Sequence, residues 1–236
     1  MRVVVLFERS GVVRRAFAAR GHSVVSVDLA AAEDGSPDHV RMDVREFFER
    51  NDPALFDLMI AFPDCTFLAG SGLHWNGRRP GRLEKTEEAL AMIRWLMLLP
   101  IRRKAIENPR GAIGSRIRRA FQVIQPYCFG HDASKETHLW LDGLMPLPED
   151  PRLYVEPRLV GGRPRWGNQT DSGQNRLSPS PTRAMEWVRT YEGVAQAMAR
   201  WWGGASLVVH STQELTREVL SDGRQGFPVM DPPVPA

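Results

Sequence analysis

The sequence is poor in cysteine and lysine. Its 236 residues include two cysteines, far apart in the chain, and three lysines. Two distant cysteines argue against a disulfide scaffold, and we expect a reducing, intracellular setting. The six histidines do not cluster with the cysteines, so no zinc or other metal site is predicted.

Long apolar runs are also missing. No stretch approaches the roughly 20 apolar residues of a membrane span, so no contact with a membrane is expected. The run Val3–Phe7 is too short for a signal peptide and is followed at once by Glu8 and Arg9.

Positive charge in this chain is almost all arginine. The net charge is +3 and the isoelectric point is about 9.2. Arginine suits the recognition of phosphate and guanine, which favours a nucleic-acid partner. A GC-rich genome would explain the same composition equally well.

The first 28 residues predict a nucleotide-binding unit. Residues 2–7 form a β-branched apolar run typical of a buried parallel strand. Ser10 is a plausible helix N-cap, and a second strand, 23–28, ends in Asp28. An acid at that position can bind ribose hydroxyls. Gly11 stands nearly alone where dinucleotide sites carry three glycines, so a Rossmann-like half without a cofactor is the alternative.

Two further strands place a thiol and an acid at one sheet edge. The apolar strand 56–61 runs into Pro63 and Cys65, and the strand 104–109 carries Glu107 near its end. One group could attack a substrate while the other donates or accepts a proton. The alternatives are a small buried cysteine and a solvated turn glutamate. Asp43, at the tip of a short third strand, is expected to face the same cleft.

Two segments favour contact with nucleic acid. Residues 101–120 hold seven basic residues against one acid, and the polar run 167–176 carries amides that can read bases or bind phosphates. The alternative for the amides is a solvated loop. The residues predicted to contact nucleic acid are Arg102, Arg103, Arg110, Arg116, Arg118, Arg119, Asn168 and Gln169.

The remaining pattern divides the chain into three parts. Residues 1–141 and 190–203 are expected to form one Rossmann-like domain, with an amphipathic helix at 83–99, a basic aromatic loop at 70–82 and a closing helix at 190–202. Residues 142–189 lack periodicity and are expected to form a small irregular insert. Residues 204–236 are expected to be an appended, partly flexible tail.

The chain resembles the short cytosine-C5 DNA methyltransferase homologues of phages and prophages. The resemblance covers about residues 2–203 and rests on the order and spacing of several short segments. They are Glu8-Arg9-Ser10-Gly11, Asp28, Asp43, Phe62-Pro63-Asp64-Cys65-Thr66, Ile106-Glu107-Asn108-Pro109, Gln122-Val123-Ile124-Gln125-Pro126, Thr137-His138-Leu139-Trp140-Leu141, Asn168-Gln169-Thr170-Asp171-Ser172-Gly173-Gln174-Asn175 and Tyr191-Glu192-Gly193-Val194-Ala195-Gln196-Ala197-Met198.

The resemblance implies an α/β fold with a mostly parallel, Rossmann-like sheet that binds S-adenosylmethionine, in the cytoplasm of a bacterial or phage-infected cell. It implies that the Cys65 thiolate adds to C6 of a flipped-out DNA cytosine, that Glu107 holds and protonates N3, and that C5 then takes the methyl group. The cofactor contacts that it implies come from Glu8, Ser10, Gly11, Asp28, Asp43 and Pro63.

The sequence departs from that family in three places. Asp64 replaces a proline beside the thiol and should raise the pKa of Cys65. The first loop has few glycines, and the target-recognition region is nearly absent, so sequence specificity should be short, lax or supplied by a protein partner. Two other functions stay open: another pyrimidine C5 modification, such as hydroxymethylation or a reaction on a nucleotide, and non-catalytic DNA binding.

Overall fold

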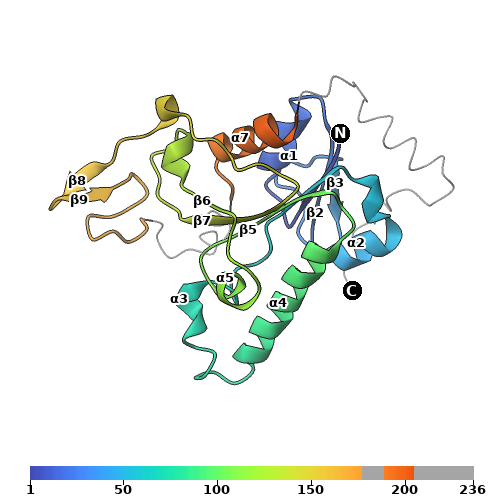
Figure 1. Ribbon diagram of the computed structural model, residues 1–236, viewed down its shortest axis with the longest axis horizontal. Helices are drawn as coiled ribbons and strands as arrows, with labels where there is room; N and C mark the ends of the chain where they lie inside the picture. Colours follow the sequence, from blue (N-terminus) through green and yellow to red (C-terminus); the bar gives the residue numbers. More distant parts are fainter. Residues whose placement is uncertain (177–188, 205–236) are drawn as a thin grey trace, which may run out of the picture.

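A seven-stranded sheet forms the centre of the protein (Figure 1). The computed structural model describes residues 1–176 and 189–204. The strands, in chain order, are β1 (Arg2–Leu6), β2 (Ser23–Asp28), β3 (His39–Arg41), β4 (Leu58–Ala61), β5 (Arg103–Asn108), β6 (Gln122–Ile124) and β7 (Thr137–Asp142). Their spatial order is β3-β2-β1-β4-β5-β7-β6.

All neighbouring strands from β3 to β5 are parallel, and β7 alone runs against its neighbours β5 and β6. The order reverses between β1 and β4, so the carboxyl ends of β1, β2, β4 and β5 meet at one edge beside the switch point, where α/β sheets bind ligands. The predicted α/β fold with a mostly parallel, Rossmann-like sheet is confirmed.

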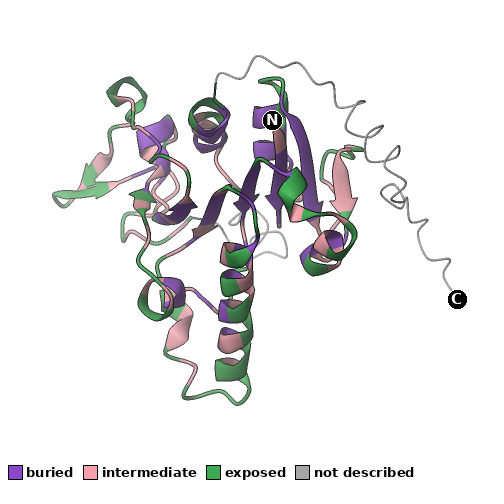
Figure 2. Ribbon diagram, turned by 45° about the vertical axis from the view of Figure 1, so that its right-hand side comes forward, coloured by how far each residue is buried: buried purple, intermediate pink, exposed green. Residues whose placement is uncertain are grey.

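Helices cover both faces of the sheet. On one face lie α1 (Val12–Ala18) and α7 (Glu192–Trp202), and on the other lie α2 (Val44–Arg50), α4 (Arg82–Leu98) and α5 (Ala112–Arg116). The side chains of β4 alternate between the two cores, as the two-residue period of a strand requires. Figure 2 shows the resulting buried layer along the central strands. Among the described helices, none is long and apolar enough to cross a membrane.

The predicted start of the first helix is wrong. Gly11, not Ser10, is the N-cap residue of α1, and it adopts the left-handed φ of 67° that glycine tolerates. The buried carboxylate of Glu8 accepts hydrogen bonds from the backbone N–H groups of Val13 (2.6 Å) and Arg14 (3.2 Å). A carboxylate satisfies these unpaired groups and complements the positive end of the helix, which leaves no need for a serine cap.

Other predicted elements lie close to their expected ranges, including the strand 23–28 and the helices at 83–99 and 190–202. The predicted loop 70–82 begins with a short helix, α3 (Gly70–Leu73). Short 3₁₀ turns occur at η1 (Pro53–Leu55), η2 (Pro126–Phe129) and η3 (Pro151–Leu153).

The described part of the predicted insert projects from the sheet beyond β6 (Figure 1). It contains the hairpin of β8 (Arg158–Val160) and β9 (Arg163–Arg165). Both turn residues, Gly161 and Gly162, have positive φ, which fits a tight two-residue hairpin turn. Residues 177–188 of the insert and 205–236 of the tail lie outside the described residues, so both domain boundaries stay predictions.

We expect the packing of α7 on the sheet to depend on Trp202. Its side chain is 1% exposed, and its indole N–H donates to the Met145 carbonyl oxygen at 2.9 Å. Trp202→Ala should lower the free energy of unfolding by about 3–5 kcal/mol, because it leaves a cavity in the core. Urea denaturation followed by circular dichroism measures this change.

The neighbouring Trp201 provides a matched control, since it is 38% exposed. Trp201→Ala should cost less than about 1 kcal/mol. Equal losses for the two variants would contradict the packing assigned to α7.

Candidate functional site

A cavity of about 600 Å³ lies at the carboxyl ends of the parallel strands. Four strand ends supply its walls: residues 7–10 after β1, 28–29 at β2, 62–65 after β4 and 107–109 at β5. Residues 134–136 before β7 and residues 189–190 before α7 complete them. A cavity of this size is typical of sites that hold a cofactor or a small ligand.

Cys65 is half-buried in a fixed loop of the cavity wall. The Asp64 carboxylate accepts from the Thr66 backbone N–H (2.9 Å) and hydroxyl (2.6 Å). The Cys65 carbonyl oxygen accepts from the N–H groups of Leu68 (3.0 Å) and Ala69 (2.8 Å). Asp64 therefore shapes the loop as well as placing a negative charge beside the thiol.

Asn108 joins this loop to the neighbouring strand. Its side-chain amide donates to the Pro63 carbonyl oxygen at 2.8 Å. The side-chain oxygen of Asn108 is buried and has no hydrogen-bond partner among the described residues. A donor on a bound ligand would satisfy an acceptor of this kind.

Burial and three charged groups set the acidity of the Cys65 thiol. Burial raises the pKa of Cys65 most, and the negative charges of Asp64 and Glu107 raise it further, while the Lys135 ammonium lowers it. Burial and Glu149 raise the pKa of the other cysteine, Cys128, to about 11. Cys65 lines the open cavity, whereas Cys128 is buried in the core, so the two thiols differ in access as well as in acidity.

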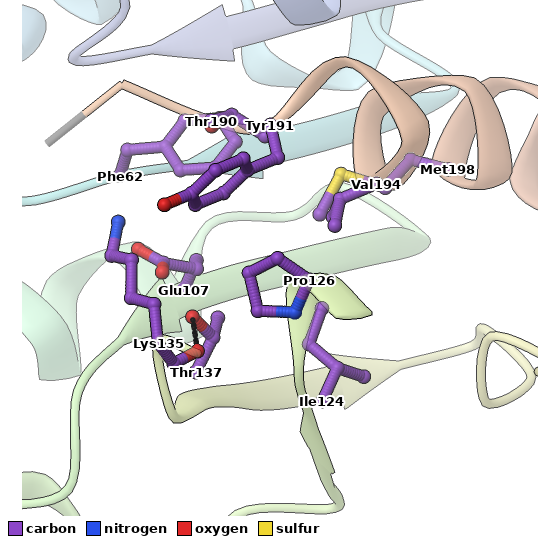
Figure 3. Close-up of a pocket in the computed structure, with 10 residues that line it drawn as sticks. All are labelled: Phe62, Glu107, Ile124, Pro126, Lys135, Thr137, Thr190, Tyr191, Val194 and Met198. Carbon is purple, nitrogen blue, oxygen red and sulfur yellow. Dashed lines mark hydrogen bonds between the residues drawn. The ribbon is translucent and has the colours of Figure 1, made fainter. Parts of the chain in front are cut away.

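Glu107 faces a small chamber next to the main cavity. The chamber has a volume of about 20 Å³, enough for one water molecule, and Lys135, Thr137 and Tyr191 also line it. Figure 3 shows the Lys135 amino group and the Tyr191 hydroxyl on the same side as the Glu107 carboxylate. Proton donors thus lie beside this carboxylate in a chamber whose other walls are largely apolar.

The residues predicted to bind the cofactor divide into two groups. Glu8, Ser10, Asp28 and Pro63 line the cavity. One oxygen of the Asp28 carboxylate accepts from the Ala30 N–H at 2.8 Å. Both oxygens of Glu8 hold helix α1, and burial raises the pKa of this carboxyl against the hydrogen bonds and nearby arginines that lower it. Glu8 therefore positions the first loop.

Gly11 and Asp43 do not line the cavity. A side chain at Gly11 would meet Arg14, Arg15 and Asp34, so its role is to allow the tight turn. The Asp43 carboxylate accepts from the Arg45 N–H at 2.8 Å and caps α2. One oxygen of this carboxylate therefore serves the helix N-terminus, and the predicted contact of Asp43 with a cofactor stays a prediction.

The basic residues of 101–120 do not form one patch. Arg102 and Arg103 lie at the amino end of β5, and Arg118 pairs at 2.8 Å with Asp142, which lies opposite Lys104 at that end. Five steps of about 3.3 Å put this end about 17 Å from Asn108. Arg116 is paired with Glu87 at 2.8 Å, and Arg119 is exposed.

Arg110 alone of the predicted arginines adjoins the cavity. It is exposed and lines a groove of about 600 Å³ that shares Pro109 and Glu136 with the cavity wall. The amides of Asn168 and Gln169 bond within the protein: Asn168 bonds the backbone of Ser134, and the Gln169 oxygen accepts from the Trp166 N–H at 3.2 Å.

Sequence reasoning assigned no role to several residues of the cavity wall, among them Phe7, Asn108 and Lys135. Phe7 has a left-handed φ of 58°, a conformation that is rare outside glycine and that often marks functional sites. Lys135 could have been identified as a candidate from the sequence, because it is one of only three lysines and lies just before a predicted strand. Among the described residues, no group of three or more His, Cys, Asp or Glu residues is placed to hold a metal ion.

A scan against protein-family models and a search of curated proteins found no match. Among solved structures, the chain is similar to one from E. coli described as a "putative DNA modification methyltransferase encoded within prophage". The two chains share 17% identity with a TM-score of 0.39, over 60% of this chain and 46% of the other. The chain thus spans less than half the length of that neighbour.

We predict that replacing Asp64 activates the thiol. Asp64→Asn keeps an oxygen for Thr66 but removes the charge that raises the pKa of Cys65. More thiolate should then form at neutral pH, and iodoacetamide should alkylate Cys65 about twofold faster or more. Mass spectrometry of the Cys65 peptide measures the rate.

An exposed acid outside the cavity, Glu49, supplies the control. Glu49→Gln should leave the rate unchanged, and Cys128 should stay unlabelled in every variant. An unchanged rate in Asp64→Asn would show that this carboxylate does not control the thiol.

Proposed function

We propose that the protein is a DNA cytosine-C5 methyltransferase that uses S-adenosylmethionine. One observation carries the proposal: the cavity places Cys65 and Glu107, from adjacent parallel strand ends, in the same space as Asp28 at the end of β2. A nucleophilic thiol, a proton-exchanging acid and an acid suited to ribose are the groups that this reaction requires.

The cavity wall fits the cofactor. Asp28, at the end of β2, uses one carboxylate oxygen to accept from the Ala30 N–H, and its second oxygen is available to a ligand. Phe7 and Ser10, which follow β1, add an aromatic residue and a hydroxyl to the wall. Phe7, Ser10, Asp28 and Pro63 would hold S-adenosylmethionine. When bound, this cofactor supplies an electrophilic methyl group.

The remaining chemistry belongs to the side chains of the chain itself. The Cys65 thiolate forms a bond to C6 of a flipped-out cytosine while Glu107 gives a proton to N3, which leaves C5 electron-rich. After C5 gains the methyl group, a water molecule takes the C5 proton, the bond from Cys65 to C6 breaks to restore the thiolate, and N3 returns its proton to Glu107. Lys135 lies where its charge lowers the pKa of Cys65 and favours the thiolate.

The first test is methyl transfer itself. Duplex DNA and S-adenosylmethionine with a labelled methyl group should yield labelled 5-methylcytosine, identified by mass spectrometry of the nucleosides. Cys65→Ser should reduce transfer at least about 100-fold, because it removes the nucleophile. Cys128→Ser, at the other cysteine, should retain it.

Two outcomes would reject this proposal. One is the absence of both transfer and cofactor binding by calorimetry. The other is full transfer by Cys65→Ser. Detection of another modified pyrimidine, or modification of a free nucleotide alone, would instead favour the alternative function, a different modification at C5. Asp64 is the feature that favours this alternative, because its charge raises the pKa of the nucleophilic thiol.

A second test compares two exposed arginines at opposite ends of β5. Arg110 adjoins the cavity and Arg102 does not. Arg110→Ala should weaken duplex binding about threefold or more at moderate salt and lower the slope of log K against log salt by about one. Arg102→Ala should change neither, and fluorescence anisotropy over a salt series measures both. A larger loss from Arg102→Ala would place the DNA at the other edge of the sheet.

A further inference from the structure

The Asn168 side chain holds the backbone of a cavity residue from both sides. Its oxygen accepts from the Ser134 N–H, and its amide N–H donates to the Ser134 carbonyl oxygen, both at 2.9 Å. Such a paired contact fixes the orientation of one peptide segment. The amide that the sequence assigned to nucleic acid is therefore used inside the protein.

The next residue, Lys135, is held from a second direction. Its backbone N–H donates to the Gln125 side-chain oxygen at 2.9 Å. Two amides, from segments before η2 and after β9, thus fix two successive residues that line the main cavity. These two attachments restrict the backbone position of Lys135, and so the point from which its side chain extends into the cavity.

Asn168 also lies near the side chain of Tyr191, where its amide opposes the rise that burial gives to the pKa of the phenol. Tyr191 and Lys135 both line the chamber of Glu107 (Figure 3). The Asn168 side chain therefore lies next to both Tyr191 and the peptide segment that leads into Lys135.

The β8–β9 hairpin in turn fixes the position of Asn168. The Arg158 guanidinium of β8 donates to the carbonyl oxygens of Trp166 (2.8 Å) and Gln169 (2.7 Å), which flank Asn168. The Gly167 N–H donates to the Asp132 carboxylate at 2.6 Å, which ties the same loop to the segment before Ser134. A continuous set of hydrogen bonds thus runs from the hairpin to Lys135.

We propose that Asn168 is a positioning residue that holds Lys135 beside Cys65 and Glu107 and so links the β8–β9 hairpin to the reacting groups. The inference deepens the proposed function and rests on it for the role of the thiol in catalysis. Its effect on the thiol itself does not depend on methyl transfer.

The charges around Cys65 predict in which direction the pKa of the thiol changes when Lys135 is displaced. Asp64 and Glu107 raise the pKa of the thiol and Lys135 lowers it; three further acids, Glu8, Asp28 and Glu136, line the same cavity. Arg9, Glu33 and Arg189 form an ion-pair cluster at its rim. If Lys135 moves away, the charges nearest the thiol are acidic, and less thiolate forms at a given pH.

The test is the rate of Cys65 alkylation by iodoacetamide between pH 7 and 10, followed by mass spectrometry. Lys135→Met and Asn168→Ala should each slow alkylation about twofold or more at a fixed pH below the midpoint, and move the profile to higher pH. Gln125→Ala, which releases Lys135 from the other direction, should do the same. Gln174→Ala removes an exposed amide in the same loop and should change nothing.

A double variant distinguishes positioning from general loosening. Asn168→Ala should add little to Lys135→Met, because the charge that it positions is already gone. Additive effects, or a profile of Asn168→Ala equal to wild type, would overturn the inference. So would a Lys135→Met profile equal to wild type.

Methyl transfer is measured on the same proteins and separates the two proposals. Slower alkylation in Asn168→Ala together with no transfer by wild type would support the positioning role and reject the methyltransferase. Transfer by wild type with no response of Cys65 to Asn168→Ala would do the reverse.

Discussion

The parallel pairing of β4 with β5 is the constraint on which the candidate site depends. Its register sets Ala61 opposite Ile106, so the residues that follow each strand emerge side by side. The hydrogen bond from Asn108 to the Pro63 carbonyl oxygen then joins the two ends beyond the last rung of the sheet. Cys65 lies two residues after Pro63, and Glu107 lies directly before Asn108. A large shift of either segment would therefore break this hydrogen bond. A buried bond of this kind is worth only about 1 kcal/mol net, but leaving its partners unpaired costs more.

Electrostatics at this edge is unfavourable for a nucleophilic thiolate. Burial and two carboxylates raise the pKa of Cys65, and Lys135 is the cation that opposes them. Asp64 cannot simply be regarded as a defect, because its carboxylate also closes the turn around Thr66. The loop therefore gains its shape from a group that weakens its nucleophile. The amount of Cys65 thiolate therefore depends on where the Lys135 ammonium lies. The hydrogen bonds to the backbone around Lys135 matter for the thiol because they set that position.

The sequence allowed the elements and the sheet edge to be predicted because both follow from local patterns. β-branched apolar runs mark the buried strands, and each strand carries its polar residue at a recognisable end. The partner that each polar side chain selects could not be predicted in this way. Asp43 was expected in the cleft, and one of its carboxylate oxygens caps α2. Ser10 was expected to cap α1, whereas Glu8 accepts from the N–H groups in the first turn of that helix. In both cases the choice between a ligand and a helix N-terminus depends on side-chain directions that a sequence does not give.

The arginine-rich segment shows the same limit on a larger scale. Residues 101–120 are close in sequence, but Arg103 begins β5 and Arg110 follows its other end. The strand β7 brings Asp142 to neutralise Arg118. Charge density along the chain is therefore a poor guide to charge density on the surface. Residues far apart in sequence can also act together: Asn168 lies 33 positions after Lys135 and still holds the backbone beside it. Because Arg158 of the β8–β9 hairpin holds the loop that carries Asn168, any displacement of the hairpin would act on Lys135, and through it on the thiol.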